Sequence, residues 1–535
     1  MGAALRPMGS GRIHGAAFHH EALGEAAHRQ AVRRLERAVH RLRRERPEFS
    51  AGEPVWPWQR LLFAALAIAL VAGAAAAPRA TQSMLLAMLS LPFLCVVLLR
   101  ALALWHARSR PSRRREQSPS GLTHPAFPSR SAGSASPLGE AMLPRYSVLV
   151  PLYREAHVVP GLLEALARID YPSSKLEILL VVESIDRETR AALRAAALAP
   201  HMRVVVVPDG MPRTKPRALA FALEVARGDY VVVYDAEDVP EPDQLRRALE
   251  RLRSAPRVGC VQARLNIYNS DETWLTRQFT IEYTALFDCL LPTLERLKLP
   301  VPLGGTSNHF PRAVLDEVGG WDPFNVTEDA DLGIRLARAG WQVEVLSSTT
   351  WEEAPAQFKV WLGQRTRWLK GWMQTYLVHM REPLRLAREL EAKRFLGLQV
   401  LMGGLILSAL VHPWFCMFAL LDAVQGQMLV VPGSLTGRAL WWLGAFNLVT
   451  AYVTGIVLGS VAVARRGRLD LARHAVLMPL YWLMISLAAY RALGQLIAAP
   501  HLWEKTEHAA RSRRTGPMSP RSLKEPAGAA LEPQL

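Results

Sequence analysis

The sequence has few cysteines. Only four occur among 535 residues, and no two of Cys95, Cys260, Cys289 and Cys416 are close together in the chain. This scatter excludes the spacing of a zinc site or a disulfide framework, and it is compatible with a reducing compartment. A secretory signal is also missing, because the first long apolar run begins near Leu61, too deep for a cleavable signal peptide.

Lys and Arg outnumber Asp and Glu by 64 to 47, which gives a formal net charge of +17. Basic clusters flank apolar runs, and they include Arg33, Arg34, Arg41, Arg43 and Arg44, and then Arg108, Arg110, Arg113, Arg114 and Arg115. No nucleic-acid-binding motif accompanies them. We therefore expect these clusters to lie beside anionic membrane lipid, and we expect no nucleic-acid partner.

Residues 20–46 form a basic amphipathic pattern with Ala, Leu and Val at helical spacing. We expect a helix there that is solvated or lies on a membrane surface.

Half of the residues are hydrophobic, and many lie in long apolar runs. Residues 61–77 and 83–105 are separated by a short turn at Pro78 and Arg79, which predicts a membrane-spanning hairpin, with buried helices of a soluble domain as the alternative. Three further spans are expected at about 396–420, 440–464 and 474–498.

The charges between these later runs indicate an orientation. The last loop contains Arg465, Arg466, Arg468 and Arg473 and is expected to be cytoplasmic, whereas the loop at 422–438 has few charges and is expected to be external. The basic tail after Trp503 conflicts with three simple crossings. Either 396–432 holds an extra crossing, or the last apolar run lies partly along the interface.

Between the two groups of apolar runs the pattern changes twice. Residues 107–143 are rich in Ser, Pro, Arg and Gly and read as a linker. Strands are then expected at 146–152, 176–182, 204–207 and 230–234, alternating with helices at 158–169, 187–197 and 215–226. This alternation predicts an α/β fold with a mostly parallel sheet, in which ligands lie beyond the carboxyl ends of the strands. Glu183 and Asp235 fall at such ends.

The run from Val231 to Asp238 places carboxylates directly after an apolar strand. Mg²⁺ and Mn²⁺ prefer oxygen ligands, and Asp235 and Glu237 share one side if the strand geometry continues. The run therefore predicts a site for Mg²⁺ or Mn²⁺, with an ordinary acidic turn as the alternative.

A second acidic group, Glu328-Asp329-Ala330-Asp331, opens an amphipathic helix after Thr327. One of these acids is a candidate general base. The alternative is structural, because Thr327 could cap the helix and acids in its first turn suit the helix dipole.

A third group, Gln364-Arg365-Thr366-Arg367-Trp368, lies on a helix rich in Trp. Arginine binds phosphate in a bidentate manner, and Trp offers a face on which a sugar stacks. An interfacial helix with an aromatic belt is the alternative, and the two interpretations are compatible.

The order of these groups carries a resemblance. The segments VPLYRE, VVESID, TKPRAL, YDAED, GGTSNHF, VTEDADL and QRTRW together resemble the membrane-embedded family 2 glycosyltransferases, which include cellulose, chitin and hyaluronan synthases. The resemblance covers roughly residues 144–385. It implies a GT-A nucleotide-sugar-binding domain beside a helical transmembrane bundle, a nucleotide-sugar donor (UDP-sugar by resemblance), direct displacement and inversion at the anomeric carbon.

The resemblance also implies roles for single residues. Asp329 would be the catalytic base, and Asp235 and Glu237 would bind metal. The nucleotide sugar would be bound by Pro151, Glu155, Glu183, Lys215, Asp235, Gln364 and Arg367. The acceptor would be bound by Gly305, Thr306, Ser307 and Trp368, within the segment Gly304 to Asn308 and at the end of the QxxRW motif.

The sequence departs from the family pattern at several points. Glu replaces the usual Asp at positions 183 and 237, and neither an FxVTxK gating-loop signature nor a C-terminal regulatory β-barrel is evident. We therefore expect a relative of cellulose synthase with another product. The expected acceptor is a growing polysaccharide, and the alternative is transfer of a single sugar to a lipid or glycan carrier. A non-catalytic membrane scaffold and a soluble sugar nucleotidyltransferase fit the motifs and apolar runs less well.

The expected organisation follows from these patterns. It comprises a basic region at 1–55, a transmembrane hairpin at 56–107, a linker at 108–143, the GT-A domain at 144–350, interfacial helices at 351–392, transmembrane helices at 393–500 and a basic tail at 501–535. We expect a multi-pass protein of the bacterial inner membrane with its catalytic domain in the cytoplasm.

Overall fold

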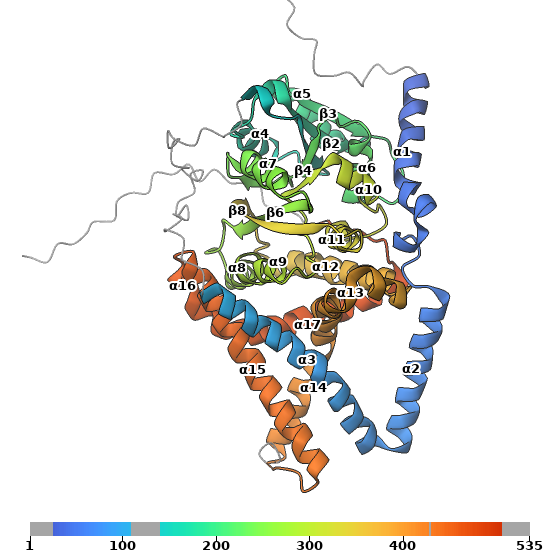
Figure 1. Ribbon diagram of the computed structural model, residues 1–535, viewed down its shortest axis with the longest axis vertical. Helices are drawn as coiled ribbons and strands as arrows, with labels where there is room; N and C mark the ends of the chain where they lie inside the picture. The colour runs from blue at the N-terminus through green and yellow to red at the C-terminus, as the bar shows by residue number, and fades with distance from the viewer. Residues whose placement is uncertain (1–24, 109–139, 427–429, 506–535) are drawn as a thin grey trace, which may run out of the picture.

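The computed structural model describes residues 25–108, 140–426 and 430–505. Most of the expected linker at 108–143 and of the expected tail at 501–535 therefore lies outside the described residues, as do Arg110, Arg113, Arg114 and Arg115. In Figure 1 an α/β domain stands on a layer of helices, and long helices extend from the other side of that layer.

The α/β domain is built on one sheet with the strand order β3-β2-β1-β4-β7-β6-β8-β5. The strands are β1 (Tyr146–Leu152), β2 (Leu176–Glu183), β3 (Met202–Val207), β4 (Tyr230–Val233), β5 (Val239–Pro240), β6 (Val258–Ile267), β7 (Asn308–Pro311) and β8 (Gln342–Glu352). The pairings make β7 and β5 antiparallel to the other six strands. The expectation of a mostly parallel sheet is confirmed.

Helices cover both faces of the sheet. Because side chains alternate along each strand, neighbouring residues of one strand are buried on opposite faces. Val148 and Val150 are fully buried on the face covered by α4 (Val159–Ala167), α5 (Arg187–Ala195) and α7 (Gln244–Ser254). Leu149 is fully buried on the opposite face, beneath α6 (Lys215–Leu223). The strands and helices expected between residues 146 and 234 are confirmed, with ends that differ by a few residues.

The N-terminal helix α1 (Glu25–Glu45) corrects an expectation. Its apolar side chains Leu35 and Val39 belong to the main hydrophobic core, and α1 packs against α6. Figure 1 shows α1 standing along the α/β domain, so this helix is neither purely solvated nor laid on a membrane. Its basic residues cover the solvent side while its apolar stripe is buried by protein.

A layer of helices lies between the sheet and the long helices (Figure 1). Its members are α8 (Trp274–Ala285), α9 (Leu291–Arg296), α12 (Phe358–His379) and α13 (Pro383–Leu398). Two further helices, α10 (Arg312–Glu317) and α11 (Glu328–Arg338), belong to the α/β domain. Helix α12 places the QRTRW segment beneath the sheet.

Five stretches of the described chain are long and apolar enough to cross a membrane: Pro57–Ala76, Ala80–Arg108, Pro383–Val424, Leu435–Arg465 and Leu469–Ala498. They contain the helices α2 (Pro57–Ala76), α3 (Pro78–Arg108), α14 (Gly404–Val424), α15 (Leu435–Arg465), α16 (Leu469–Ala472) and α17 (Met478–Ala498). All five apolar runs noted in the sequence thus fall in candidate spans.

Helix α17 differs from the other long helices, because both of its ends contact the catalytic side. Just before it, His474 accepts a hydrogen bond from Gln278 of α8 (2.8 Å). Just after it, the Lys505 ammonium pairs with Glu155 (3.0 Å). Helix α17 packs along α12 and lies beneath it in Figure 1. These contacts favour the interpretation in which the last apolar run lies along the interface.

Candidate active site

One large cavity of about 1350 Å³ begins beneath the carboxyl ends of the strands and continues among the long helices. Its upper part is lined by most of the expected site residues: Pro151, Glu155, Glu183, Lys215, Asp235, Glu237, Gly305, Asp329, Gln364, Arg367 and Trp368. Segments far apart in the chain thus meet around one space. Glu237, Asp329 and Arg367, one residue from each expected acidic or QxxRW motif, all contribute to this wall.

Gly305 marks the point at which three of these side chains converge. A Cβ atom at this position would lie 3.4 Å from Asp329 Oδ2, 3.8 Å from Lys215 Nζ and 4.0 Å from Asp235 Oδ2. Because Gly305 has no side chain, this space stays open. A reacting group of a few atoms placed there would contact carboxylates and an ammonium group.

Lys215 is held at this point by two bonds. Its ammonium group pairs with Asp235 and donates to the Gly305 carbonyl (2.7 Å). Burial lowers the pKa of Lys215, but the carboxylates of Asp235, Glu328 and Asp329 outweigh burial, so the pKa lies above its usual value. Lys215 therefore stays positively charged at any physiological pH.

The acidic loop after β4 is held from behind by buried side chains. The Asp235 backbone N–H donates to Asp238 Oδ2 (2.7 Å), and the Thr306 hydroxyl bonds to the same carboxylate and to the Val233 carbonyl. Ser307 bonds to Thr350 within the sheet (2.6 Å). Thr306 and Ser307 are fully buried and do not line the cavity. The structure therefore places them behind the site as supports, and not where an acceptor would bind.

The carboxylates of this loop fit a divalent cation in their chemistry. Burial, followed by the nearby Asp235 carboxylate, raises the pKa of Glu237 to about 7. Such crowding of negative charge is relieved by a bound cation, and Mg²⁺ and Mn²⁺ take oxygen ligands. No group of three or more His, Cys, Asp or Glu side chains is arranged to hold a metal within the described residues. A metal at Asp235 and Glu237 would therefore need further oxygen ligands from the substrate.

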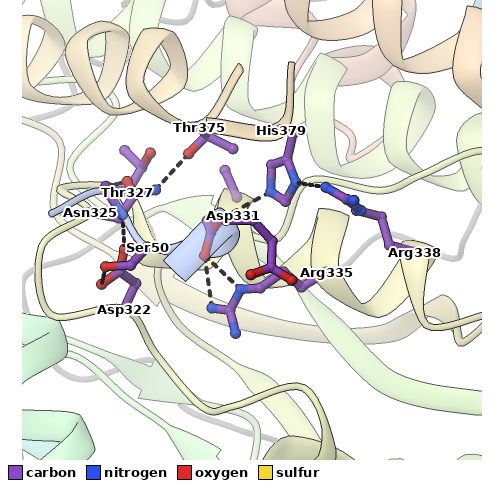
Figure 2. Close-up of polar contacts among 12 residues, drawn as sticks. Ser50, Asp322, Asn325, Thr327, Asp331, Arg335, Arg338, Thr375 and His379 are labelled. Carbon is purple, nitrogen blue, oxygen red and sulfur yellow. Dashed lines mark hydrogen bonds and ion pairs between the residues drawn. The ribbon is translucent and has the colours of Figure 1, made fainter. Parts of the chain in front are cut away.

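Helix α11 carries Asp329, and the network in Figure 2 fixes the loop that precedes this helix. Asn325 accepts a hydrogen bond from the Thr327 backbone N–H (3.0 Å) and donates to Thr375 of α12 (2.9 Å). Asp322 accepts hydrogen bonds from the Ser50 hydroxyl and from the Ala51 backbone N–H. The segment that connects α1 to α2 thus helps to hold the loop.

Buried hydrogen bonds to His379 hold α11 against α12 on the same side (Figure 2). Asp331 bonds to Arg335 (2.8 Å) and to Nε2 of His379 (3.0 Å), and Arg338 donates to His379 Nδ1 (3.1 Å). Burial alone would raise the pKa of Asp331, but Arg335 and His379 hold it below its usual value. At Gly371 the two elements approach closely, since a Cβ there would lie 2.4 Å from Thr327 side-chain atoms.

Asp329 itself points into the cavity. Burial raises the pKa of Asp329 to about 6, although the Ala330 backbone N–H and the cationic Lys215 and Arg367 oppose this change. Neighbouring Glu328 has its pKa raised to about 8, by burial first and then by Asp329. A carboxylate with a pKa near the working pH is suited to accept a proton in a reaction, so Asp329 fits a general base.

The two arginines of the QRTRW segment make different contacts. Arg365 pairs with Glu282 of α8 (3.0 Å) and donates to the Tyr481 hydroxyl of α17 (2.9 Å), so it joins three helices. Arg367 lines the cavity, and its guanidinium carbon lies 4.4 Å from the centre of the Trp503 ring. Trp368 stacks on Tyr283 with ring centres 6.0 Å apart. Both arginines line the cavity, Arg365 bonded to Glu282 and Arg367 beside Trp503.

The segment after α17 supplies two cavity-lining residues that the sequence reasoning missed. Trp503 contacts Arg367, and Lys505 pairs with Glu155 at the end of β1. The segment is fixed by α12, because Lys370 donates to the Leu502 carbonyl (2.7 Å) and Gln374 donates to the Pro500 carbonyl (2.9 Å). An aromatic and a basic residue directly after an apolar helix were the available signal, and they were interpreted as part of a tail.

Glu183, the expected base-binding residue, has a partner in the structure. Its carboxylate pairs with the buried Arg217 of α6. Burial raises the pKa of Glu183, while Arg217 acts in the opposite direction. Glu183 still lines the cavity together with Pro151 and Glu155, so this part of the cavity lies at the ends of β1 and β2.

Comparison with known proteins agrees with this geometry. Residues 144–371 match the family described as glycosyltransferase like family 2. A probable glycosyltransferase YdaM of Bacillus subtilis is 29% identical over 252 residues, which cover 46% of this chain and 60% of that protein. A beta-monoglucosyldiacylglycerol synthase of Synechocystis is 30% identical over 266 residues, which cover 48% and 55%. Glucomannan 4-beta-mannosyltransferase 2 of Arabidopsis thaliana is 29% identical over 243 residues, which cover 44% and 45%.

The chain spans about half the length of these curated relatives. The matched region begins just before β1 and ends on α12, and it therefore contains the sheet, the two acidic motifs and QRTRW. Residues 144–371 of this chain are a family 2 glycosyltransferase domain of the GT-A type.

Proposed function

We propose that the protein transfers a sugar from a nucleotide sugar, by inference a UDP-sugar, to an acceptor hydroxyl at the cytoplasmic face of a bacterial inner membrane. The observation that carries the proposal is the point at Gly305, within 4.0 Å of Asp329, Lys215 and Asp235. A base and a cation beside one open space are what the transfer of a sugar from a diphosphate requires.

The proposed step is a direct displacement. Asp329 accepts the proton of the acceptor hydroxyl, and the acceptor oxygen forms a bond to the anomeric carbon. The bond between that carbon and the diphosphate oxygen breaks, and the nucleoside diphosphate leaves with the electron pair. Attack from the face opposite the leaving group inverts the anomeric centre. Lys215 and Arg367 offset the negative charge that gathers on the diphosphate.

Asp235 and Glu237 are the residues that would hold Mg²⁺ or Mn²⁺. A divalent ion bound there would add positive charge beside the departing diphosphate. Pro151, Glu155 and Glu183 would border the nucleoside, and Gln364 would lie beside Arg367. Trp368 would form the acceptor side of the site, together with the open backbone at Gly305.

The acceptor class is the second part of the proposal. The resemblance favours a growing polysaccharide, with a lipid carrier as the alternative. The lower part of the cavity supports the lipid, because apolar side chains of α3, α14 and α15 make up most of its wall. A polysaccharide chain needs polar partners for its hydroxyl groups, whereas acyl chains need none. We therefore propose a lipid acceptor as the favoured case.

The same contacts support a membrane arrangement with four crossings. Helices α2, α3, α14 and α15 would cross, and α17 would lie along the interface beside α12. Arg465 and Arg466 at the end of α15 bond to Ala107 and Asp288 on the catalytic side, which fits a cytoplasmic position for basic residues. An even number of crossings also returns the basic tail to the cytoplasmic side.

A donor screen tests the activity. Purified full-length protein in lipid nanodiscs is incubated with UDP-sugars and GDP-sugars, with Mg²⁺, with Mn²⁺ or with a chelator, and release of nucleoside diphosphate is measured. We expect release from one donor class, dependence on a divalent cation, and loss of release in the Asp329→Asn variant with donor binding retained. Release that is unchanged in Asp329→Asn would contradict the assigned base, and no release from any donor would contradict the proposed activity.

A further inference from the structure

Four helices bring polar and aromatic side chains together in the part of the cavity that lies among the membrane-spanning segments. The group consists of Arg100 of α3, His412 of α14, Tyr452 of α15 and Trp482 of α17, and all four line the cavity. The Arg100 guanidinium carbon lies 4.8 Å from the centre of the Trp482 ring. Trp482 stacks on Tyr452 (5.8 Å, 20°), whose hydroxyl bonds to His412 (2.9 Å). We refer to these four residues as the Arg100 cluster.

Arg100 has no anionic partner in this cluster. Among the described residues it makes the cation–π contact with Trp482 but no hydrogen bond or ion pair. The carboxylate of Glu282, which also lines the cavity, attracts Arg100 electrostatically without bonding to it, because Glu282 is bonded to Arg365 and Tyr481. An arginine inside a membrane span is costly unless something compensates its charge, so an unpaired one that lines a cavity indicates a ligand.

The position of Arg100 suits the head group of a lipid. It lies about two helical turns, roughly 12 Å, before the end of α3 at Arg108 on the catalytic side. Below it the wall is mainly apolar, with Leu86, Leu89 and Phe93 of α3 and Phe415 and Phe418 of α14, although Gln82 and Asp422 also contribute. Above it lie Glu282, Trp368 and the carboxylates of the active site. The cavity therefore changes from apolar to charged at the level of this cluster.

The cavity is also bordered by residues that face the lipid phase. Leu70 and Ala74 of α2 contribute to its wall, and Leu70 is 43% exposed. Gln59, near the start of α2, is the residue of this helix that the rest of the protein buries. In Figure 1, α2 stands apart from α14 and α15 at the edge of the helices and is joined to α3 at its far end. A lipid could thus enter sideways from the bilayer without crossing the catalytic domain.

We infer that the Arg100 cluster binds the phosphate of a phospholipid acceptor, with its acyl chains in the apolar part of the cavity and its hydroxyl-bearing head group directed toward Asp329. The guanidinium group binds phosphate in a bidentate manner, which accounts for an arginine at this depth without a protein carboxylate. This inference rests on the proposed function, since it names the acceptor of the same site.

Lipid retention tests the inference without requiring turnover. Full-length protein is incorporated into phosphatidylcholine nanodiscs that contain one-fifth phosphatidylglycerol or one-fifth diacylglycerol, extracted into mild detergent, and analysed for bound lipid by native mass spectrometry. We expect the wild type to retain phosphatidylglycerol over diacylglycerol, and Arg100→Gln to retain about tenfold less phosphatidylglycerol. Arg108→Gln, at the exposed end of the same helix, is the matched control and should retain the wild-type amount.

Soluble glycerol phosphate, added as a competitor, separates a lipid site from a simple phosphate site. We expect little displacement, because the acyl chains contribute most of the binding. Equal retention by Arg100→Gln and the wild type, equal retention of diacylglycerol, or full displacement by glycerol phosphate would each overturn the inference.

A second variant keeps the test decisive if Arg100→Gln does not fold. Gly444 of α15 lines the cavity, and a Cβ there meets no atom within 4 Å, so Gly444→Leu fills the space without a clash. It should also lower retention, and unchanged retention would count against the site. Donor turnover, measured on the same preparations, separates the two proposals. If donor turnover is observed and lipid retention does not depend on Arg100, the lipid site alone is refuted. If lipid retention depends on Arg100 but no donor turnover is observed, the transferase activity alone is refuted.

Discussion

The two halves of the cavity differ in chemistry and in the origin of their walls. The upper half is lined by carboxylates and cations that follow strands or begin helices of the GT-A domain, such as Asp235, Lys215 and Asp329. The lower half is lined mainly by apolar and aromatic side chains of long helices. The difference supports the proposal that one continuous space serves two substrates of opposite solubility, and it places the change in lining near Trp368 and Glu282.

The two halves also differ in how their charges are balanced. In the upper half, burial and nearby carboxylates raise the pKa values of Glu237 and Glu328 to about 7 and 8. This excess of buried negative charge favours a cationic ligand. In the lower half, the charge of Arg100 has no ion-pair partner among the described residues, which favours an anionic one. Variants in the two halves should therefore affect different substrates.

The largest effect is expected for Asp329→Asn in the upper half. The amide cannot accept the acceptor proton, and general bases contribute about 10²–10⁴ to rate, so kcat should fall by about 10³. The wild-type rate should rise with pH through about 6 as Asp329 loses its proton. Steady-state release of nucleoside diphosphate across pH 5–8 measures both the fall in kcat and the pH dependence of the wild-type rate.

Lipid retention should be normal in Asp329→Asn, since the lower half is untouched. Asp316→Asn, on α10 away from the cavity, is the control for the loss of a carboxylate. A variant that loses lipid and catalysis together would show that the two halves act as one unit.

The sequence predicted the upper half far better than the lower half. Residues that follow strands or open helices are placed by local structure, so position indicates Asp235 and Glu237 directly. For the general base, position indicates only the acids that open the helix after Thr327, and the resemblance selects Asp329 among them. Thr306 and Ser307 share a motif with Gly305, but they lie in the loop before β7, where the direction of a side chain depends on tertiary contacts, and both are buried. A motif therefore indicated the right segment without indicating which of its residues reach the ligand.

Helices α1 and α17 show why the rest was not predictable. An apolar stripe is the same in sequence whether protein or lipid covers it. Leu35 and Val39 of α1 are covered by the GT-A domain, and α17 lies along α12 although its composition suits a membrane span. Consequently Trp503 and Lys505, which depend on where α17 ends, could not be assigned to the site from the pattern.

A smaller but still large effect is expected for Arg367→Gln, which also belongs to the upper half. The variant keeps a polar side chain but loses the charge that would face the diphosphate and the contact with Trp503. Loss of one such electrostatic group costs about 10²-fold in rate, and we expect this loss in kcat/KM for the nucleotide sugar. The KM for the acceptor lipid should be unchanged. Arg227→Gln, an exposed arginine at the start of a turn, is the control, and an equal loss there would contradict the assignment.

Filling the lower half of the cavity should weaken acceptor binding and leave nucleotide-sugar binding unchanged. Gly444→Leu places a side chain in open cavity space, so the acceptor KM should rise about tenfold, the equivalent of about 1.4 kcal/mol of lost binding. Nucleotide-sugar binding, measured by calorimetry, should be unaffected. Gly494→Leu on α17 is matched in chemistry and is also free of contacts within 4 Å, but it does not line the cavity. If both variants raise the acceptor KM equally, the lower half does not hold the acceptor.

The smallest effect on catalysis is expected for Thr375→Val, which changes no wall residue of either half. The valine leaves the Asn325 amide without its acceptor in a fully buried place, at a cost of about 1–3 kcal/mol in the free energy of unfolding. Because Asn325 also holds the backbone before Asp329, kcat should fall only a few fold while both KM values stay constant. Thermal unfolding followed by tryptophan fluorescence measures the loss of stability. Thr450→Val in α15 is the matched control, because its hydroxyl bonds only within its own helix. A normal unfolding temperature in Thr375→Val, or an equal fall in Thr450→Val, would show that the Asn325 network does not hold the catalytic loop.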